Sequence, residues 1–146
     1  MEALRVEEDA DRLVVRLRGV LSREGVLDLG ARLRGSLGER LPDSAVLLDL
    51  TEVTECGVEA CQRMAVLQRK LGARGLRTAY LCDRARIHGA AWWIVHASKD
   101  QRATPVSTLE QAERWFDSRA LRVDELHDRA PNASAALRRR TTEVAE

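Results

Sequence analysis

The 146-residue chain lacks the features that mark several large classes of protein. No apolar run approaches the roughly 18 residues of a membrane-spanning helix, and the N-terminal residues lack the apolar segment of a signal peptide. The formal net charge of +1 gives no general attraction to nucleic acid or to an anionic membrane. Three cysteines are an odd number without the spacing of a disulfide framework, which favours a reducing compartment. We therefore expect a cytoplasmic protein that binds neither nucleic acid nor membrane.

The sequence also lacks the local signatures of catalysis and of metal binding. Its glycines form no phosphate-binding loop. His88 and His96 lie about two helical turns apart, which matches no zinc-ligand pair. Cys56 and Cys82 add no tight ligand spacing. No nucleophile, base and oxyanion donor can be assembled from these residue types, so we expect no enzyme, no cofactor and no metal site.

The stretch over residues 45–75 organises what is present. Residues 45–50 form a short, uninterrupted apolar run that predicts a buried strand. The polar residues 51–57 predict a loop. From Val58 the apolar residues recur at helical spacing, which predicts a helix that stops between Gly72 and Gly75. Because α/β proteins usually place their working residues where a strand feeds a helix, we expect the functional edge here.

Residues before this stretch predict an antiparallel hairpin and a helix. The hairpin alternates apolar and polar residues over positions 4–18 and is closed by Gly19. Ser22 is the expected N-cap of the first helix. The apolar stripe of that helix comprises Val26, Leu29, Leu33 and Leu37.

Residues after the central helix continue the alternation. A strand over residues 76–82 leads to a helix that Asp83 caps and that ends near Ser98. A short strand over residues 103–107 contains a proline, which predicts an edge position, and Thr108 caps the helix that follows. The order β-β-α-β-α-β-α-β-α predicts an α/β fold with a mixed, largely parallel sheet of about five strands packed by about four helices.

The spaced apolar residues become sparse towards the C-terminus. Residues 132–140 offer little apolar surface to bury. We therefore expect one domain over residues 1–117 and a helical or flexible tail over residues 118–146.

This layout resembles the STAS domain, the fold of bacterial anti-sigma-factor antagonists. The similar pieces are "DRLVVRLRGVLS" from Asp11, "AVLLDLTEVT" from Ala45 and "STLEQAERWF" from Ser107. The resemblance implies a STAS-like, non-catalytic protein-protein interaction module that serves signal transduction and transcription regulation. Its implied partner is an anti-sigma factor that doubles as a serine kinase, or another regulator. In the family, that kinase phosphorylates the second serine of an Asp-Ser-Ser-Gly segment at the start of the central helix.

That phosphorylation motif is missing here. An ungapped alignment from Asp49 places residues 57–60 (Gly-Val-Glu-Ala) at the four positions, and a shift of three residues places residues 54–57 (Thr-Glu-Cys-Gly) there. We prefer the ungapped alignment because it keeps the usual loop length. The acceptor serine is replaced by Glu59 in one alignment and by Cys56 in the other, so the resemblance implies the architecture without the serine switch.

We expect the partner-binding surface on the predicted loop and at the exposed start of the central helix, where acidic side chains present charge to the partner. Its residues are Thr51, Glu52, Thr54, Glu55, Cys56, Gly57, Val58, Glu59 and Gln62. Glu59 is a regulatory candidate as a partial mimic of phosphoserine. The simpler interpretation, which we weight more heavily, is an acidic residue stabilised by the helix dipole. Thr54, like Thr51, is a candidate phosphate acceptor or a hydroxyl that satisfies nearby backbone groups.

The cysteines and tryptophans suggest further roles. Cys56 precedes a helix N-terminus, where the helix dipole lowers a thiol pKa, and Cys82 ends the next strand, so the two form a candidate redox pair at one edge of the sheet. Cys61 is expected to be a buried apolar residue. Of Trp92 and Trp93, we expect one to be buried and the other to be exposed enough to anchor a partner or the tail.

Three functions therefore remain open from the sequence. The first is a regulator that resembles an anti-sigma-factor antagonist. The second is a self-associating structural or scaffold protein, which would be a homo-oligomer. The third is a small-ligand or thiol redox sensor at the edge near Cys56 and Cys82.

Overall fold

The computed structural model describes residues 3–8, 12–38 and 44–118. The chain divides into two compact units, Met1–Phe116 and Asp117–Glu146, and the first is described here by itself. Apart from Ser118, the tail expected over residues 118–146 lies outside the described residues. The domain boundary and the tail therefore stay predictions.

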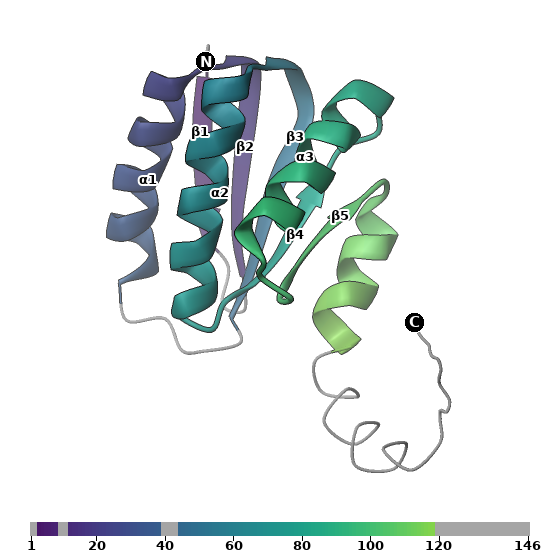
Figure 1. The fold of residues 1–146 in the computed structure, drawn as a ribbon. Helices are drawn as coiled ribbons and strands as arrows, with labels where there is room; N and C mark the ends of the chain where they lie inside the picture. The colour runs from purple at the N-terminus through teal and green to yellow at the C-terminus, as the bar shows by residue number, and fades with distance from the viewer. Residues whose placement is uncertain (1–2, 9–11, 39–43, 119–146) are drawn as a thin grey trace. The chain divides into compact units, whose positions relative to one another are not determined.

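Five strands form one mixed sheet in the order β1-β2-β3-β4-β5 (Figure 1). β1 is antiparallel to β2, and the other neighbouring strands are parallel. The mixed, largely parallel sheet is confirmed, and so is the edge position of the proline-containing strand. The strands are β1 (Ala3–Glu8), β2 (Arg12–Leu21), β3 (Ala45–Cys56), β4 (Arg77–Leu81) and β5 (Ala103–Val106).

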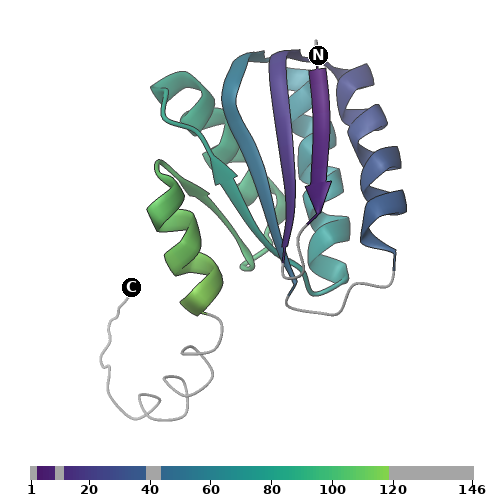
Figure 2. The same cartoon turned by 180° about the vertical axis from the view of Figure 1, so that it is seen from behind.

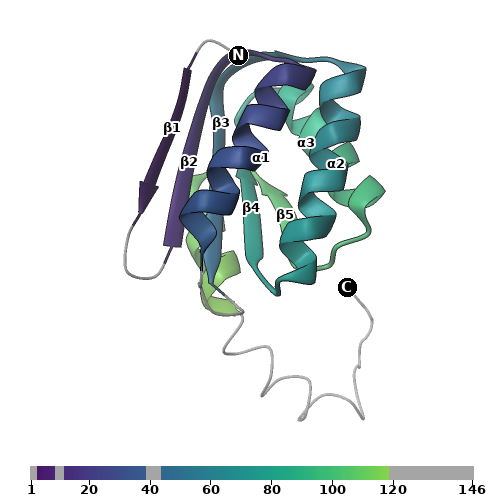
Figure 3. The ribbon, with the colours of Figure 1, turned by 90° about the vertical axis from the view of Figure 1, so that its left-hand side faces the viewer.

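Three helices cover one face of the sheet: α1 (Arg23–Leu37), α2 (Val58–Ala73) and α3 (Ala85–Ser98). Each helix connects one strand to the next parallel strand in the order β2, β3, β4, β5. Because such crossovers are right-handed, all three helices lie on the same face of the sheet. Figure 3 shows α1 and α2 together on one side of the sheet that contains β1, β2 and β3. In the last helix, residues 109–116 pack on the opposite face (Figure 2). Within the described residues, no helix combines the length and apolarity that a membrane span requires.

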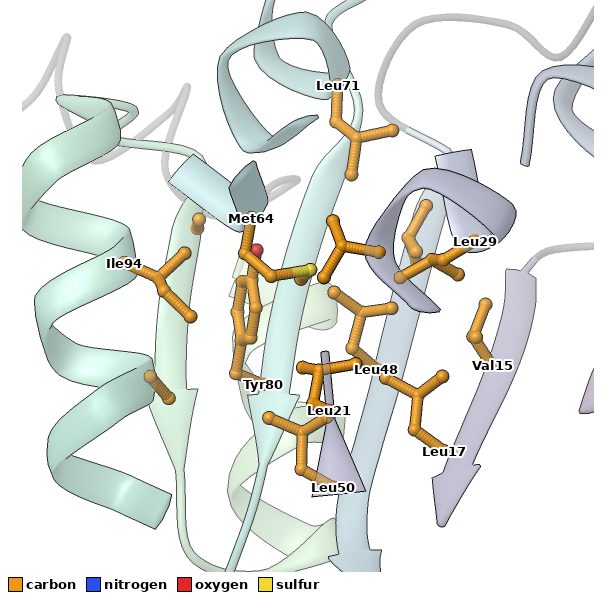
Figure 4. Close-up of a cluster of buried hydrophobic side chains, with 14 of the residues drawn as sticks. Val15, Leu17, Leu21, Leu29, Leu48, Leu50, Met64, Leu71, Tyr80 and Ile94 are labelled. Atoms are coloured by element: carbon orange, nitrogen blue, oxygen red, sulfur yellow. The ribbon is translucent and has the colours of Figure 1, made fainter. Parts of the chain in front are cut away.

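The larger core fills the space between the sheet and these three helices. Leu17 of β2, Leu48 of β3 and Tyr80 of β4 point towards Leu29 of α1 and Met64 of α2 (Figure 4). All five side chains are at most 1% exposed. The predicted α1 stripe is confirmed, because each of its four residues is buried.

The smaller core lies under the last helix. Ala112 and Phe116 of that helix pack on the sheet residues Ala45, Leu47, Ala79, Leu81 and Val106. Arg77 is buried, with its guanidinium 4.1 Å from the Trp115 ring and its Nε donating to the Trp115 carbonyl at 3.1 Å. The Trp115 indole in turn donates to the Thr78 carbonyl at 3.1 Å. β3 and β4 are thus covered on both faces, which explains their nearly continuous apolar runs.

Two predicted N-caps are confirmed, and the boundaries predicted at Gly19 and Asp83 are wrong. The Ser22 hydroxyl accepts from the Gly25 amide and Thr108 accepts from the Gln111 amide, both at 3.1 Å, which confirms the two N-caps. Gly19 does not close β2: at φ 87° it sits beside an irregularity in the pairing, and the strand continues to Leu21. Asp83 does not cap α3, because that helix starts after Arg84 and no side chain caps it.

Candidate functional site

β3 runs well past its neighbour β4 at the predicted functional edge. Pairing with β4 ends at Asp49↔Leu81, whereas pairing with β2 continues to Leu21↔Cys56. Residues 51–56 therefore belong to a two-stranded ribbon, and the predicted loop is wrong. Within residues 51–56 only Val53 is apolar and buried, so this stretch has the composition of a loop and shows no repeated alternation of apolar and polar residues.

Arg84 occupies the open side of this ribbon. Its guanidinium donates to the Thr51 carbonyl at 3.0 Å and also to the Val53 carbonyl. Arg84 therefore satisfies the carbonyl oxygens of Thr51 and Val53, which lie beyond the end of the pairing with β4. The Asp49 carboxylate accepts from the Thr51 amide at 3.0 Å and from the Thr51 hydroxyl at 2.7 Å. The partner of the Thr51 hydroxyl is thus a side-chain carboxylate and not the backbone group that we expected, and its role as a phosphate acceptor stays untested.

The start of α2 projects an apolar side chain between acidic ones. Gly57 is the N-cap in an extended conformation, and no side chain caps the helix. Val58 is 76% exposed, more than any other large apolar side chain that is described. Glu55 and Glu59 are exposed, and among the described residues neither has an ion-pair partner. Glu52, in contrast, lies 3.9 Å from the Arg18 Nε.

We call the predicted binding residues the β3–α2 surface, because they all lie at this junction. Thr51 and Cys56 are half-buried. The others are exposed: Glu52, Thr54, Glu55, Gly57, Val58, Glu59 and Gln62. Val53, which the prediction left out, is buried and anchors the ribbon on the core. These residues are therefore neighbours along the β3–α2 junction, and their binding role stays a prediction.

The structure places Cys61, rather than Cys82, against Cys56. The two sulfur atoms of Cys56 and Cys61 lie 3.2 Å apart, and both residues are half-buried free thiols. The hydrogen bond from Cys56 lowers the pKa of Cys61, whereas the same bond and burial raise the pKa of Cys56. Cys61 is therefore not the fully buried apolar residue that we expected.

Cys82 has a different environment. Its side chain is 1% exposed, and its sulfur atom lies 3.7 Å from the His88 Nδ1. Burial raises the pKa of Cys82 to about 11, with a smaller contribution from the Asp83 carboxylate. No group of three or more His, Cys, Asp or Glu side chains within the described ranges is placed to hold a metal ion.

Both tryptophans of α3 are exposed, which corrects the expectation that one is buried. Trp92 is 53% exposed and Trp93 is 45% exposed. The buried stripe of α3 contains Ile87, Ala91, Ile94, Val95 and Ser98, and both tryptophans lie outside it. Trp92 stacks on His96, with their ring centroids 3.7 Å apart.

A groove between α1 and α2 was not predicted. It has a volume of about 360 Å³, an apolar floor that includes Leu33 and Leu67, and a basic rim. The rim residues are Arg34, Arg63, Lys70 and Arg74. Because these residues belong to two separate helices, no local sequence pattern indicates the groove.

The described residues have the SpoIIAA-like fold, and three solved structures document the likeness. An uncharacterised DUF3478-family protein with this fold from Shewanella loihica has a TM-score of 0.57 at 20% identity, over 78% of this chain and 92% of that chain. The unphosphorylated anti-sigma factor antagonist SpoIIAA has a TM-score of 0.53 at 16% identity, over 76% and 94% of the two chains. A serine-to-glutamate variant of RsbS from Moorella thermoacetica has a TM-score of 0.61 at 13% identity, over 81% and 97%.

At these identities the likeness shows a shared fold. No protein-family model and no curated protein matches the sequence. The function of this chain must therefore be argued from its own surface.

Proposed function

We propose that this protein is a non-catalytic regulatory module that binds a partner protein through the β3–α2 surface. The observation that carries the proposal is the exposure of Val58, whose side chain is 76% exposed at the start of α2. An apolar side chain that protrudes from a polar surface is a natural anchor for a pocket on a partner. Glu55 and Glu59, which flank Val58 in the sequence and are both exposed, would supply charged residues of the rim of such an interface.

The charge of this rim favours a partner with a basic surface. Glu55 and Glu59 carry acidic charge without an ion-pair partner among the described residues, whereas Arg18 partly offsets the charge of Glu52. Complementary charge raises association rates and rejects wrong partners. We therefore assign most of the electrostatic recognition to Glu55 and Glu59.

The class of partner comes from the fold. One of the structures that share it is an anti-sigma factor antagonist, so an anti-sigma factor, with or without serine kinase activity, is the first partner to test. The proposed setting is signal transduction and transcription regulation in a bacterial cytoplasm. Because Glu59 replaces the acceptor serine in the preferred alignment, binding would not be switched by phosphorylation at that position.

The experiment is an affinity pull-down from host lysate, followed by pairwise binding measurements with the purified partner. The test variant is Glu55→Lys/Glu59→Lys. The matched control is Glu110→Lys/Asp117→Lys, which makes the same charge change at exposed positions of the last helix. We expect a regulator of the kinase or sigma class with the wild type and the control, and its loss with the test variant. Equal recovery by all three baits would contradict the proposed surface.

The role of Glu59 needs its own variants. If Glu59 mimics phosphoserine, then Glu59→Ser and Glu59→Ala change the affinity for the purified partner. Unchanged affinity in both would leave only the helix-dipole role, which is worth about 0.3–1 kcal/mol of stability.

A self-associating scaffold is the second candidate, and the exposed tryptophans favour it. Trp92 and Trp93 are adjacent in sequence and both about half exposed, and aromatic side chains are enriched at the centres of protein–protein interfaces. Sedimentation of the wild type and of Trp92→Ser/Trp93→Ser distinguishes the candidates. An oligomer that the double variant converts to monomer would support the scaffold, and a monomeric wild type would exclude it.

A further inference from the structure

We propose that Cys56 and Cys61 form a reversible intramolecular disulfide, and that this modification switches the β3–α2 surface. The switching part rests on the proposed function, whereas formation of the disulfide does not. The two cysteines, named the thiol pair below, close a short segment that contains Gly57, Val58 and Glu59.

The geometry brings the thiol pair close to bonding distance. The sulfur atoms lie 3.2 Å apart, and a disulfide bond is about 2.05 Å long, so an approach of roughly 1 Å suffices. Cys56 is the last residue of β3 and Cys61 lies in the first turns of α2, with Gly57 between them as the N-cap. A Cβ added at Gly57 would meet nothing within 4 Å, so the turn has room to adjust.

The chemistry of the pair assigns different roles to its two members. Cys61 lies near the positive end of α2, and the hydrogen bond from Cys56 lowers its pKa, so the thiolate of Cys61 is the nucleophile. The pKa of Cys56 is raised, so Cys56 is the resolving thiol. Both residues are half-buried rather than enclosed, which leaves a small oxidant access to them.

The oxidant that balances the reaction is a peroxide. The Cys61 thiolate attacks one peroxide oxygen, the O–O bond breaks, and the leaving hydroxide takes a proton to become water. The product is a sulfenic acid on Cys61. The Cys56 sulfur then attacks the sulfenic sulfur, the S–S bond forms, and the hydroxyl leaves with the Cys56 proton as a second water. Two thiols lose two electrons in total, and a dithiol reductant reverses the reaction by thiol–disulfide exchange.

The position of the pair connects this chemistry to binding. The cross-link would tie the start of α2 to the end of β3 on either side of Val58 and Glu59. These two residues are the exposed apolar anchor and an acidic neighbour of the β3–α2 surface. Oxidation therefore changes the presentation of the segment that the partner would contact.

The first experiment follows the thiols of the full chain and needs no partner. The protein is titrated with hydrogen peroxide, alkylated and mapped by mass spectrometry, beside Cys56→Ser, Cys61→Ser and Cys82→Ala. We expect the wild type and Cys82→Ala to lose two free thiols, with a Cys56–Cys61 cross-link that a dithiol reductant removes. In Cys56→Ser, a sulfenic-acid probe should label Cys61. Intact thiols, a cross-link to Cys82 or only intermolecular dimers would each overturn the proposal.

The second experiment measures partner binding by reduced and oxidised Cys82→Ala. We expect the affinity to change by about tenfold or more on oxidation, the size of losing one important interface residue. Cys61→Ser should show no change under the same treatment. An unchanged affinity with a formed disulfide would overturn the switch, whereas the formation of the disulfide is decided by the first experiment alone.

Discussion

Replacing Tyr80 with phenylalanine tests the buried network that holds α2 against the sheet. The Tyr80 hydroxyl donates to the Gln68 Oε1 at 2.6 Å, and the Gln68 Nε2 donates to the Asp100 Oδ2 at 2.8 Å. Tyr80 and Gln68 are both 0% exposed. The network therefore ties α2 and β4, through two buried side chains, to the half-buried Asp100 in the turn after α3.

The expected cost follows from the acceptor that the substitution leaves behind. Without the hydroxyl, the Gln68 Oε1 is buried and has no donor, which costs about 1–3 kcal/mol of unfolding free energy. For a domain of this size, that corresponds to a fall in Tm of roughly 4–12 °C. The phenyl ring keeps its packing in the larger core, so loss of apolar contacts adds little.

The assay is urea denaturation followed by circular dichroism, carried out as a double-mutant cycle. Tyr80→Phe is measured in the wild type and in Gln68→Met, where the carbonyl acceptor is already absent. We expect the cost of Tyr80→Phe to drop below about 0.5 kcal/mol in the second background, because no acceptor is then stranded. An equal cost in both backgrounds would refute the assignment of the stability to this hydrogen bond.

Three further predictions concern other parts of the fold. In Gly72→Ala the new Cβ would overlap the Asp100 carboxylate, so we expect the unfolding free energy to fall by about 1–3 kcal/mol. Gly89 has open space around it, so Gly89→Ala should raise the unfolding free energy by about 0.5–1 kcal/mol. Equal effects of the two substitutions in urea denaturation would contradict this. Hydrogen bonds from Arg12 lower the pKa of Glu113, so their stabilisation is present above the unfolded pKa of about 4.3 and is lost as the pH falls through the folded pKa. Glu113→Gln should therefore cost less than about 1 kcal/mol at neutral pH, because the Glu113 side chain is 43% exposed and solvent screens the ion pair, and it should cost nothing in acid. A difference that survives in acid would disprove the link. Finally, oxidation of the thiol pair in Cys82→Ala should raise the unfolding free energy by about 2 kcal/mol, by the chain-entropy estimate for so short a loop, and unchanged denaturation with and without reductant would argue against it.

The sequence predicted the elements whose burial requires apolar residues at a regular spacing. The stripe of α1 and the apolar run at the start of β3 each face a core, so hydrophobic spacing identified them. The second half of β3 has no such constraint, because its exposed residues include Glu52, Thr54 and Glu55. Its pairing with β2 depends on two irregularities in register, which a pattern of apolar residues does not encode.

Topology placed the candidate site at the end of β3, but the conformation of residues 51–56 and the neighbour of Cys56 were predicted wrongly. A strand that feeds a helix fixes the place of Val58 and Glu59 along the chain, whatever the conformation before them. The contact between Cys56 and Cys61 depends on β3 reaching Cys56 and on a single residue, Gly57, before α2. Because residues 51–57 were predicted to form a loop, this contact was not predicted.

The extension of β3 past β4 determines how strongly substitutions at its end affect stability. Residues 51–56 are held by β2 on one side and by the Arg84 side chain on the other, and only Val53 of the six is buried. Substitutions at Glu52, Thr54 and Glu55 therefore fall in the range of about ±0.5 kcal/mol that is usual for exposed positions. The residues proposed to bind a partner are therefore different from those that stabilise the fold. A library randomised at these three positions would search new binding specificities while nearly every member still folds.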